Sequence, residues 1–226
     1  SDMFFRTASP NDKYYETEVI FSEAVRAMVP RDVQQVYWDY DESEAATYEK
    51  MIIRHKELCD DIIFAGGIWM WIGPTPHYRI SIRNARDGLA ACAKHGVREV
   101  LATIWHNGAE ASLITALPVL QLYAELDYTG VYAEEAWKRR FAFTCQASPD
   151  LLLQMEKADQ LADAGLKANP SRYLLFNDPL LGLLDKHVKQ LDIDVRAYYK
   201  ELKRWFYANA DGQGLFSEAL LSYKPH

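Results

Sequence analysis

Tyr37 and Asp39 are the first side chains along the chain whose types and spacing could do chemistry. Residues 33–40 are rich in Val, Tyr and Trp, which is typical of a strand. A period of two places Tyr37 and Asp39 on one face, opposite Trp38 and Tyr40. A carboxylate in such a strand is costly to bury without a partner. Asp39 is therefore either a structural residue that caps a neighbouring loop or helix, or a group that binds a ligand.

Tryptophans occupy the ends of the next two strand patterns. Trp69 and Trp71 share one face and precede the Gly-Pro-Thr-Pro loop at 73–76, and Trp105 is followed by Glu110 across an Asn-Gly loop. Taken singly, the indoles could be core, and Glu110 could stabilise the N-terminus of the next helix. Taken together, aromatic walls and a few carboxylates that accept hydroxyl protons are what a monosaccharide pocket requires. The residues alone thus favour a carbohydrate site.

Alternating strand and helix patterns must position these residues. The patterns predict strands at 33–40, 62–69 and 99–105, and helices at 42–59, from a cap at Ser81 to Gly96, and at 112–126. The spacing of Asp41 and Glu44 predicts a capping box, and Pro118 predicts a kink or a late helix start. Such alternation predicts parallel strands with right-handed crossovers, and ligands bind at the carboxyl ends of parallel strands.

The fold class predicted is α/β, followed by an all-α region. Three strand–helix units do not close a sheet, and a TIM barrel needs eight strands over about 250 residues. We therefore expect residues 1–128 to form the C-terminal part of a (β/α)8 TIM-barrel catalytic domain, and residues 129–226 to form a helical C-terminal domain. Ser148-Pro149 and Asp178-Pro179 are expected to be N-cap and first-turn pairs of helices.

Composition argues against several function classes. The net charge of −7 makes nucleic acid an unfavourable partner. No apolar run is long enough to span a membrane, and no signal peptide is recognised. The cysteines Cys59, Cys92 and Cys145 form no CxxC, and the histidines form no HxxxH, so neither a disulfide framework nor a metal site is expected. No cofactor motif is found, and the cysteine usage favours a reducing, cytoplasmic location.

Several segments together resemble a known family. They are SDMFFR at 1–6, VYWDY at 36–40, AGGIWMW at 65–71, TIWHNGAE at 103–110 and NDPLLG at 177–182. In order and spacing they resemble glycoside hydrolase family 20, and most nearly its bacterial exo-β-N-acetylglucosaminidases with a helical C-terminal domain. The resemblance implies a barrel enzyme that removes terminal β-linked N-acetylglucosamine, or N-acetylgalactosamine, with retention of configuration.

The resemblance also implies roles for single residues. In this family the substrate's own 2-acetamido carbonyl attacks the anomeric carbon. Tyr37 would then hydrogen-bond the acetamido group and Asp39 would bind a sugar hydroxyl. Aromatic walls would come from Trp69 or Trp71 and from Trp105. Glu110 would bind hydroxyls on the far ring edge, although its loop is one residue shorter than the pattern of this branch.

The catalytic Asp-Glu pair of the family has no counterpart here. Asp41-Glu42 begins a helix instead of ending a strand, so we expect a fragment that is inactive alone. The alternatives are a self-contained carbohydrate-binding or scaffolding domain, and another acetamido-sugar hydrolase family with the same mechanism. A fragment exposes sheet edges and an apolar face with Leu101 and Thr103 or their opposite-parity neighbours. We therefore expect self-association, most simply as a two-fold dimer.

Overall fold

A computed structural model describes residues 2–40, 44–105, 112–159, 173–174, 176–190 and 193–222 of the chain. The chain divides into two compact units that interleave along the sequence. Unit 1 comprises residues 1–68, 79–103 and 122–132, and unit 2 comprises residues 69–78, 104–121 and 133–226. Each unit is described separately, and the domain boundary expected between residues 128 and 129 stays a prediction.

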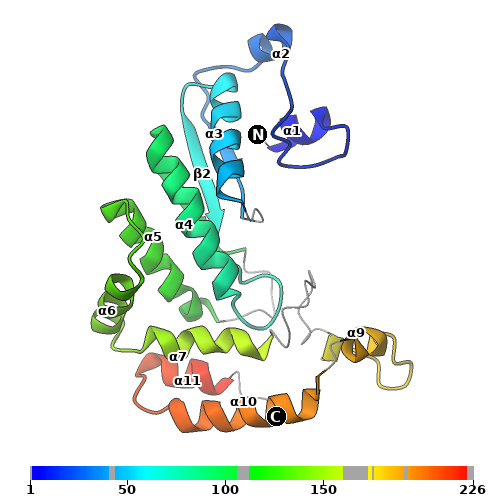
Figure 1. Ribbon diagram of the computed structural model, residues 1–226, viewed down its shortest axis with the longest axis vertical. Coiled ribbons are helices and arrows are strands. Elements are labelled where there is room, and N and C mark those ends of the chain that lie inside the picture. The colour runs from blue at the N-terminus through cyan, green and yellow to red at the C-terminus, as the bar shows by residue number, and fades with distance from the viewer. Residues whose placement is uncertain are drawn as a thin grey trace. The chain divides into compact units, whose positions relative to one another are not determined.

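Unit 1 contains a three-stranded parallel sheet in the order β1-β2-β3. The strands are β1 (Gln35–Trp38), β2 (Ile62–Gly67) and β3 (Glu99–Thr103). Helices α3 (Ala45–Leu58) and α4 (Tyr78–His95) connect them and lie side by side in front of β2 (Figure 1). The predicted strand–helix alternation and the parallel direction are confirmed. The fold of the described residues is thus α/β, and the eight-stranded barrel stays a prediction.

The helices cover the sheet face that carries Phe64. The Phe64 ring packs edge-on against Tyr48 of α3, with ring centroids 5.9 Å apart. A Cβ placed on Gly88 of α4 would lie 2.6 Å from Cζ of Phe64, so only glycine lets this helix approach so closely. Leu101 faces away from the helices, because its neighbour Val100 is the register partner of Phe64. The face opposite the helices therefore carries Leu101 and Thr103. This is the first of the two expected arrangements, and the second was that their opposite-parity neighbours lie there.

Two helix starts differ from the expected ones. Helix α4 begins at Tyr78, and Ser81 is a fully buried residue inside it, so the expected cap at Ser81 is wrong. The preceding loop closes through the hydrogen bond from the His77 backbone N–H to the carbonyl of Trp69, so the helix begins at the next residue, Tyr78. Helix α3 begins after Glu44, whose side chain makes no cap hydrogen bond, and Asp41 lies outside the described residues.

Two expected helix boundaries are confirmed. Gly96 has a φ of +66° directly after α4, the left-handed conformation that ends many helices. The short 3₁₀ helix η1 (Leu113–Ala116) precedes α5 (Leu117–Thr129). Pro118 is thus the second residue of α5, where its missing N–H costs no helical hydrogen bond. The late start that proline predicted is therefore the observed one.

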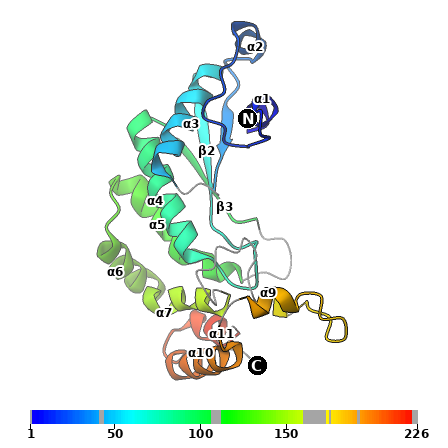
Figure 2. The same ribbon diagram turned by 45° about the vertical axis from the view of Figure 1, so that its right-hand side comes forward.

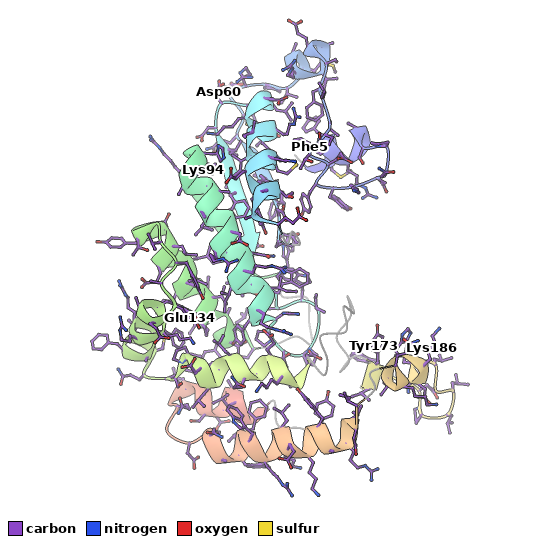
Figure 3. All side chains as sticks on the ribbon, viewed as in Figure 1. Phe5, Asp60, Lys94, Glu134, Tyr173 and Lys186 are labelled. Carbon is purple, nitrogen blue, oxygen red and sulfur yellow. The ribbon has the colours of Figure 1, made fainter. Side chains whose placement is uncertain are left out.

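The N-terminal segment of unit 1 adds α1 (Asp2–Ala8) and α2 (Glu23–Met28). Phe5, labelled in Figure 3, is fully buried. Its ring lies 5.2 Å from Phe21 and 4.6 Å from the His55 ring of α3, centroid to centroid. This segment therefore packs against α3 through aromatic side chains.

Unit 2 is helical in its C-terminal part. Its helices are α6 (Glu134–Cys145), α7 (Pro149–Leu153), η2 (Gln154–Ala158), α9 (Asp185–Lys189), α10 (Val195–Asn209) and α11 (Leu215–Ser222). From residue 131 onward the described ranges contain helices and turns and no strand, as predicted. Helix α11 lies between α7 and α10 in both ribbon views (Figure 2).

Of the two expected N-cap pairs, one forms a helix and one forms a turn. The Ser148 side chain accepts a hydrogen bond from the backbone N–H of Leu151 and so caps α7. The Asp178 carboxylate accepts from the backbone N–H groups of Leu180 and Leu181 at 2.8 Å each. There the chain turns instead, with Gly182 at a φ of +58°, so a helix after Asp178 was wrong.

Three general features bear on function. Cys59, Cys92 and Cys145 are all free thiols, and the cytoplasmic location stays a prediction. Within the described ranges, no helix combines the length and the apolar character that crossing a membrane requires. In the same ranges, no three His, Cys, Asp or Glu side chains cluster in a way that could hold a metal ion.

Candidate functional site

Tyr37 and Asp39 lie together, as the strand period predicted. The Tyr37 hydroxyl donates a hydrogen bond of 2.5 Å to Oδ2 of Asp39. Both residues have no exposed surface. Asp39 directly follows β1, and its backbone N–H donates to the carbonyl of Ala65 at 3.1 Å, which continues the pairing with β2. The two side chains thus share one face of the sheet.

That face is the one covered by helices. The Tyr37 ring lies 4.7 Å from the His55 ring of α3 and 5.5 Å from the Phe64 ring, centroid to centroid. Nδ1 of His55 lies 2.7 Å from the carbonyl oxygen of Met51, and because a carbonyl only accepts, Nδ1 carries the proton. The His55 ring therefore forms one side of the Tyr37 site. In the sequence, only its place on the apolar face of a helical pattern indicated that it would be buried there.

The surroundings keep Tyr37 in its neutral, donating form. Burial raises the pKa of the Tyr37 phenol well above its usual value, and the negative charge of Asp39 raises this pKa further. The phenol therefore donates to the carboxylate, and Asp39 has the partner that its burial demands. The contacts of both residues with an acetamido sugar stay predictions of the family resemblance.

Trp69 and Trp71 form a second pair, in unit 2. Both are half-buried, and their ring centroids lie 4.9 Å apart with an angle of 33° between the ring planes. Met70 between them is fully buried. The pair is an adjoining aromatic surface that keeps part of its area accessible.

A closed loop carries this pair. The backbone N–H of His77 donates to the carbonyl of Trp69 at 2.8 Å, which joins the two ends of the loop. The Tyr78 hydroxyl donates to the carbonyl of Thr115 at 2.7 Å and ties the loop's exit to η1. Residues 69–77 therefore form a compact loop with its ends in contact.

Two buried carboxylates contact the same loop. The backbone N–H and the hydroxyl of Thr75 both donate to Oδ2 of Asp159, each at 3.2 Å. Nδ1 of His77 lies 3.9 Å from Oε2 of Glu156. Thr75, Asp159 and Glu156 are buried. No local pattern in the sequence indicates these residues, because Thr75 and Asp159 are 84 residues apart.

The third tryptophan, Trp105, has a strained backbone conformation. Trp105 has a φ of +44°, a conformation that bulky residues rarely adopt, and 45% of its surface is exposed. It is the most exposed of the three indoles expected at the strand ends. Strain of this kind collects at functional positions, which agrees with the expected pocket role without testing it. Glu110, the last expected site residue, lies outside the described residues.

Comparison with known proteins assigns the C-terminal part of the chain. No curated protein matches the sequence. Residues 150–224 match the family model described as the Glycoside Hydrolase 20C C-terminal domain. The matched range includes Glu156 and Asp159, the carboxylates that contact the tryptophan loop. The resemblance to glycoside hydrolase family 20 is thereby confirmed in this range, where residues 150–224 are similar to the C-terminal domain of that family.

Proposed function

We propose that this chain is part of a retaining exo-β-N-acetylhexosaminidase and that Trp69 and Trp71 bind the sugar. The enzyme would remove terminal β-linked N-acetylglucosamine or N-acetylgalactosamine through substrate-assisted catalysis, within a (β/α)8 barrel. The observation that carries the proposal is the indole pair on a loop that touches the family 20C C-terminal domain. The pair supplies what a pyranose ring needs, a flat apolar surface with room for a ligand.

The indoles suit a sugar better than they suit a purely structural role. A core tryptophan is normally buried as far as its size allows, as Trp137 is here with 1% of its surface exposed. Trp69 and Trp71 keep part of their surface accessible although Met70 between them is fully buried. The CH face of an N-acetylhexosamine can cover this area, while its hydroxyl groups stay available to polar side chains.

Replacement of Trp71 by alanine is expected to weaken the binding of N-acetylglucosamine to the chain about tenfold or more. Aromatic contacts of this size contribute about 0.5–1.5 kcal/mol beyond the area they bury, and tenfold corresponds to about 1.4 kcal/mol. Ligand-observed NMR measures the affinity, and Trp71→Phe is expected to lose less.

Trp205→Ala is the matched control, because Trp205 is another half-buried indole, on α10 in the same unit. It should leave sugar affinity unchanged. Glucose, which lacks the acetamido group, should bind more weakly than N-acetylglucosamine. Wild-type protein that binds neither sugar, or equal losses in Trp71→Ala and Trp205→Ala, would contradict the proposal.

We also propose that the chain self-associates through the sheet face opposite the helices. Leu101 on this face is 46% exposed, and within the described ranges β1 and β3 pair only with β2. Exposed apolar area beside open strand edges favours association. Sedimentation velocity at micromolar concentration should show a dimer that Leu101→Lys dissociates. Leu215→Lys, at a site 79% exposed on α11, should leave it intact, and a monomeric wild type would refute the proposal.

A further inference from the structure

The contacts of the loop at residues 69–77, the tryptophan loop, indicate a role for the C-terminal region beyond its family match. Thr75 and His77 of this loop both contact carboxylates that come from η2 or from the residue that ends it, Asp159. Thr75 gives Asp159 both its hydroxyl and its backbone N–H, so the carboxylate holds the side chain and the main chain of one residue. Two donors on one oxygen restrain position and rotation together.

Helix α10 in turn holds the backbone of η2, on which these carboxylates are carried. The Tyr199 hydroxyl donates to the carbonyl of Ala158 at 3.0 Å, and the Tyr198 hydroxyl donates to the carbonyl of Lys157 at 2.7 Å. The backbone N–H of Asp159 donates to the carbonyl of Glu156 at 3.0 Å and closes the last turn of η2. A continuous series of contacts thus runs from α10 through η2 to the loop that carries the indoles.

Hydrophobic packing alone does not account for this arrangement. A buried carboxylate has a high desolvation cost, and an apolar contact of similar shape often stabilises a fold as well or better. Asp159 is 1% exposed and Glu156 is 6% exposed, and both are directed at one loop. Buried polar contacts specify one geometry more strictly than apolar packing does. The feature that this geometry controls is the relation of the two indoles.

We propose that Asp159, assisted by Glu156, is a positioning residue that presets the Trp69–Trp71 surface for the sugar ring. The sugar ligand in this inference rests on the proposed function, whereas the positioning of the two indoles by Asp159 does not. His77 links Glu156 to the indole pair. Its ring centroid lies 6.1 Å from that of Trp69, with 71° between the ring planes, and its Nδ1 lies 3.9 Å from Oε2 of Glu156. The C-terminal region thus contributes to substrate binding without touching the substrate.

The test reads the geometry of the indoles directly. Two indoles 4.9 Å apart couple and give a paired circular-dichroism band in the far ultraviolet, and the difference between wild type and Trp71→Phe isolates the contribution of this pair. Asp159→Ala and Thr75→Val should reduce the band, whereas Asp159→Asn and Thr75→Ser, which keep the acceptor and the hydroxyl, should retain it. Asp12→Ala is the matched control, because Asp12 also accepts two hydrogen bonds, from Arg6, and lies in unit 1.

Sugar affinity supplies the second measurement. Asp159→Ala should weaken the binding of N-acetylglucosamine by about three- to tenfold, in line with the loss of one or two hydrogen bonds. It should cause no further loss in the Trp71→Ala background, because it acts through that indole. A positioning role therefore predicts strong non-additivity, whereas independent effects would add.

The outcomes separate the two proposals. If Asp159→Ala folds and keeps the wild-type band, or if Asp12→Ala reduces the band equally, the positioning role is overturned. If wild type binds no sugar but the band depends on Asp159 and Thr75, the positioning role stands and the proposed function fails. Should Asp159→Ala not fold, Thr75→Val decides, because it removes one hydroxyl and leaves the carboxylate and the backbone N–H in place.

Discussion

The chain of 226 residues is expected to hydrolyse a β-linked N-acetylglucosamine disaccharide no faster than buffer does. A sugar leaving group needs a proton as the bond breaks, and general acid catalysis contributes about 10²–10⁴-fold. The only Asp-Glu dipeptide, Asp41-Glu42, follows Tyr40 and precedes α3, so it does not match the family's pair at the end of an earlier strand. Released monosaccharide, followed by chromatography over hours, measures the rate.

Binding in the same sample is the control for this result. A chain that binds N-acetylglucosamine through Trp71 but does not cleave the disaccharide has a working sugar surface and no acid. Turnover that copurifies with the chain and is lost in Trp71→Ala would show that these residues contain an acid that the resemblance does not reveal. A disaccharide is preferred to an aryl glycoside, because a good leaving group departs with less help from an acid.

Tyr37→Phe is expected to lower the free energy of unfolding by about 1.5–3 kcal/mol, the usual contribution of a hydrogen bond to a charged group. The substitution keeps the ring against His55 and Phe64 and removes only the hydroxyl that donates to Asp39. The fully buried carboxylate then lacks this donor. Urea denaturation at neutral pH measures the change. An unchanged stability would mean that Asp39 is not a buried, charged acceptor.

Tyr123→Phe is the matched control. Within the described part of the chain, the Tyr123 hydroxyl is buried and has no hydrogen-bond partner, so its removal should leave stability unchanged or raise it. Burial raises the pKa of both tyrosines above the usual value of 10. Both phenols are therefore neutral at neutral pH, and their ionisation lowers stability only as the pH rises above 10 towards the folded-state values, which is why neutral pH is used.

Local patterns predicted the strands and the shared faces well. The apolar run at 62–67 has the composition of a strand buried on both faces, and β2 is the central strand. A period of two placed Tyr37 with Asp39 and Trp69 with Trp71, and both pairs are in contact. Alternation shows which residues share a face, because that depends only on the pleat.

Which face each pair occupies could not be predicted in the same way. The period does not say that Tyr37 and Asp39 face α3, because that depends on where the helices cross the sheet. The cap expected at Ser81 failed because the closure of the loop at His77 overrides the local preference of serine. The contact of Thr75 with Asp159 joins residues distant in sequence and leaves no trace in either segment.

The hydrogen bond between His77 and Trp69 has a consequence for how this loop could diversify. Because the two ends of the loop meet at 2.8 Å and Asp159 holds Thr75, the residues between Trp71 and Thr75 can vary in length and composition while the indoles and the helix after the loop keep their places. Lengthening a closed loop costs little, since doubling its length adds only about 0.6 kcal/mol. The segment between Trp71 and Thr75 is thus an exchangeable module, in which new aromatic or polar side chains could retune ligand preference on an unchanged scaffold.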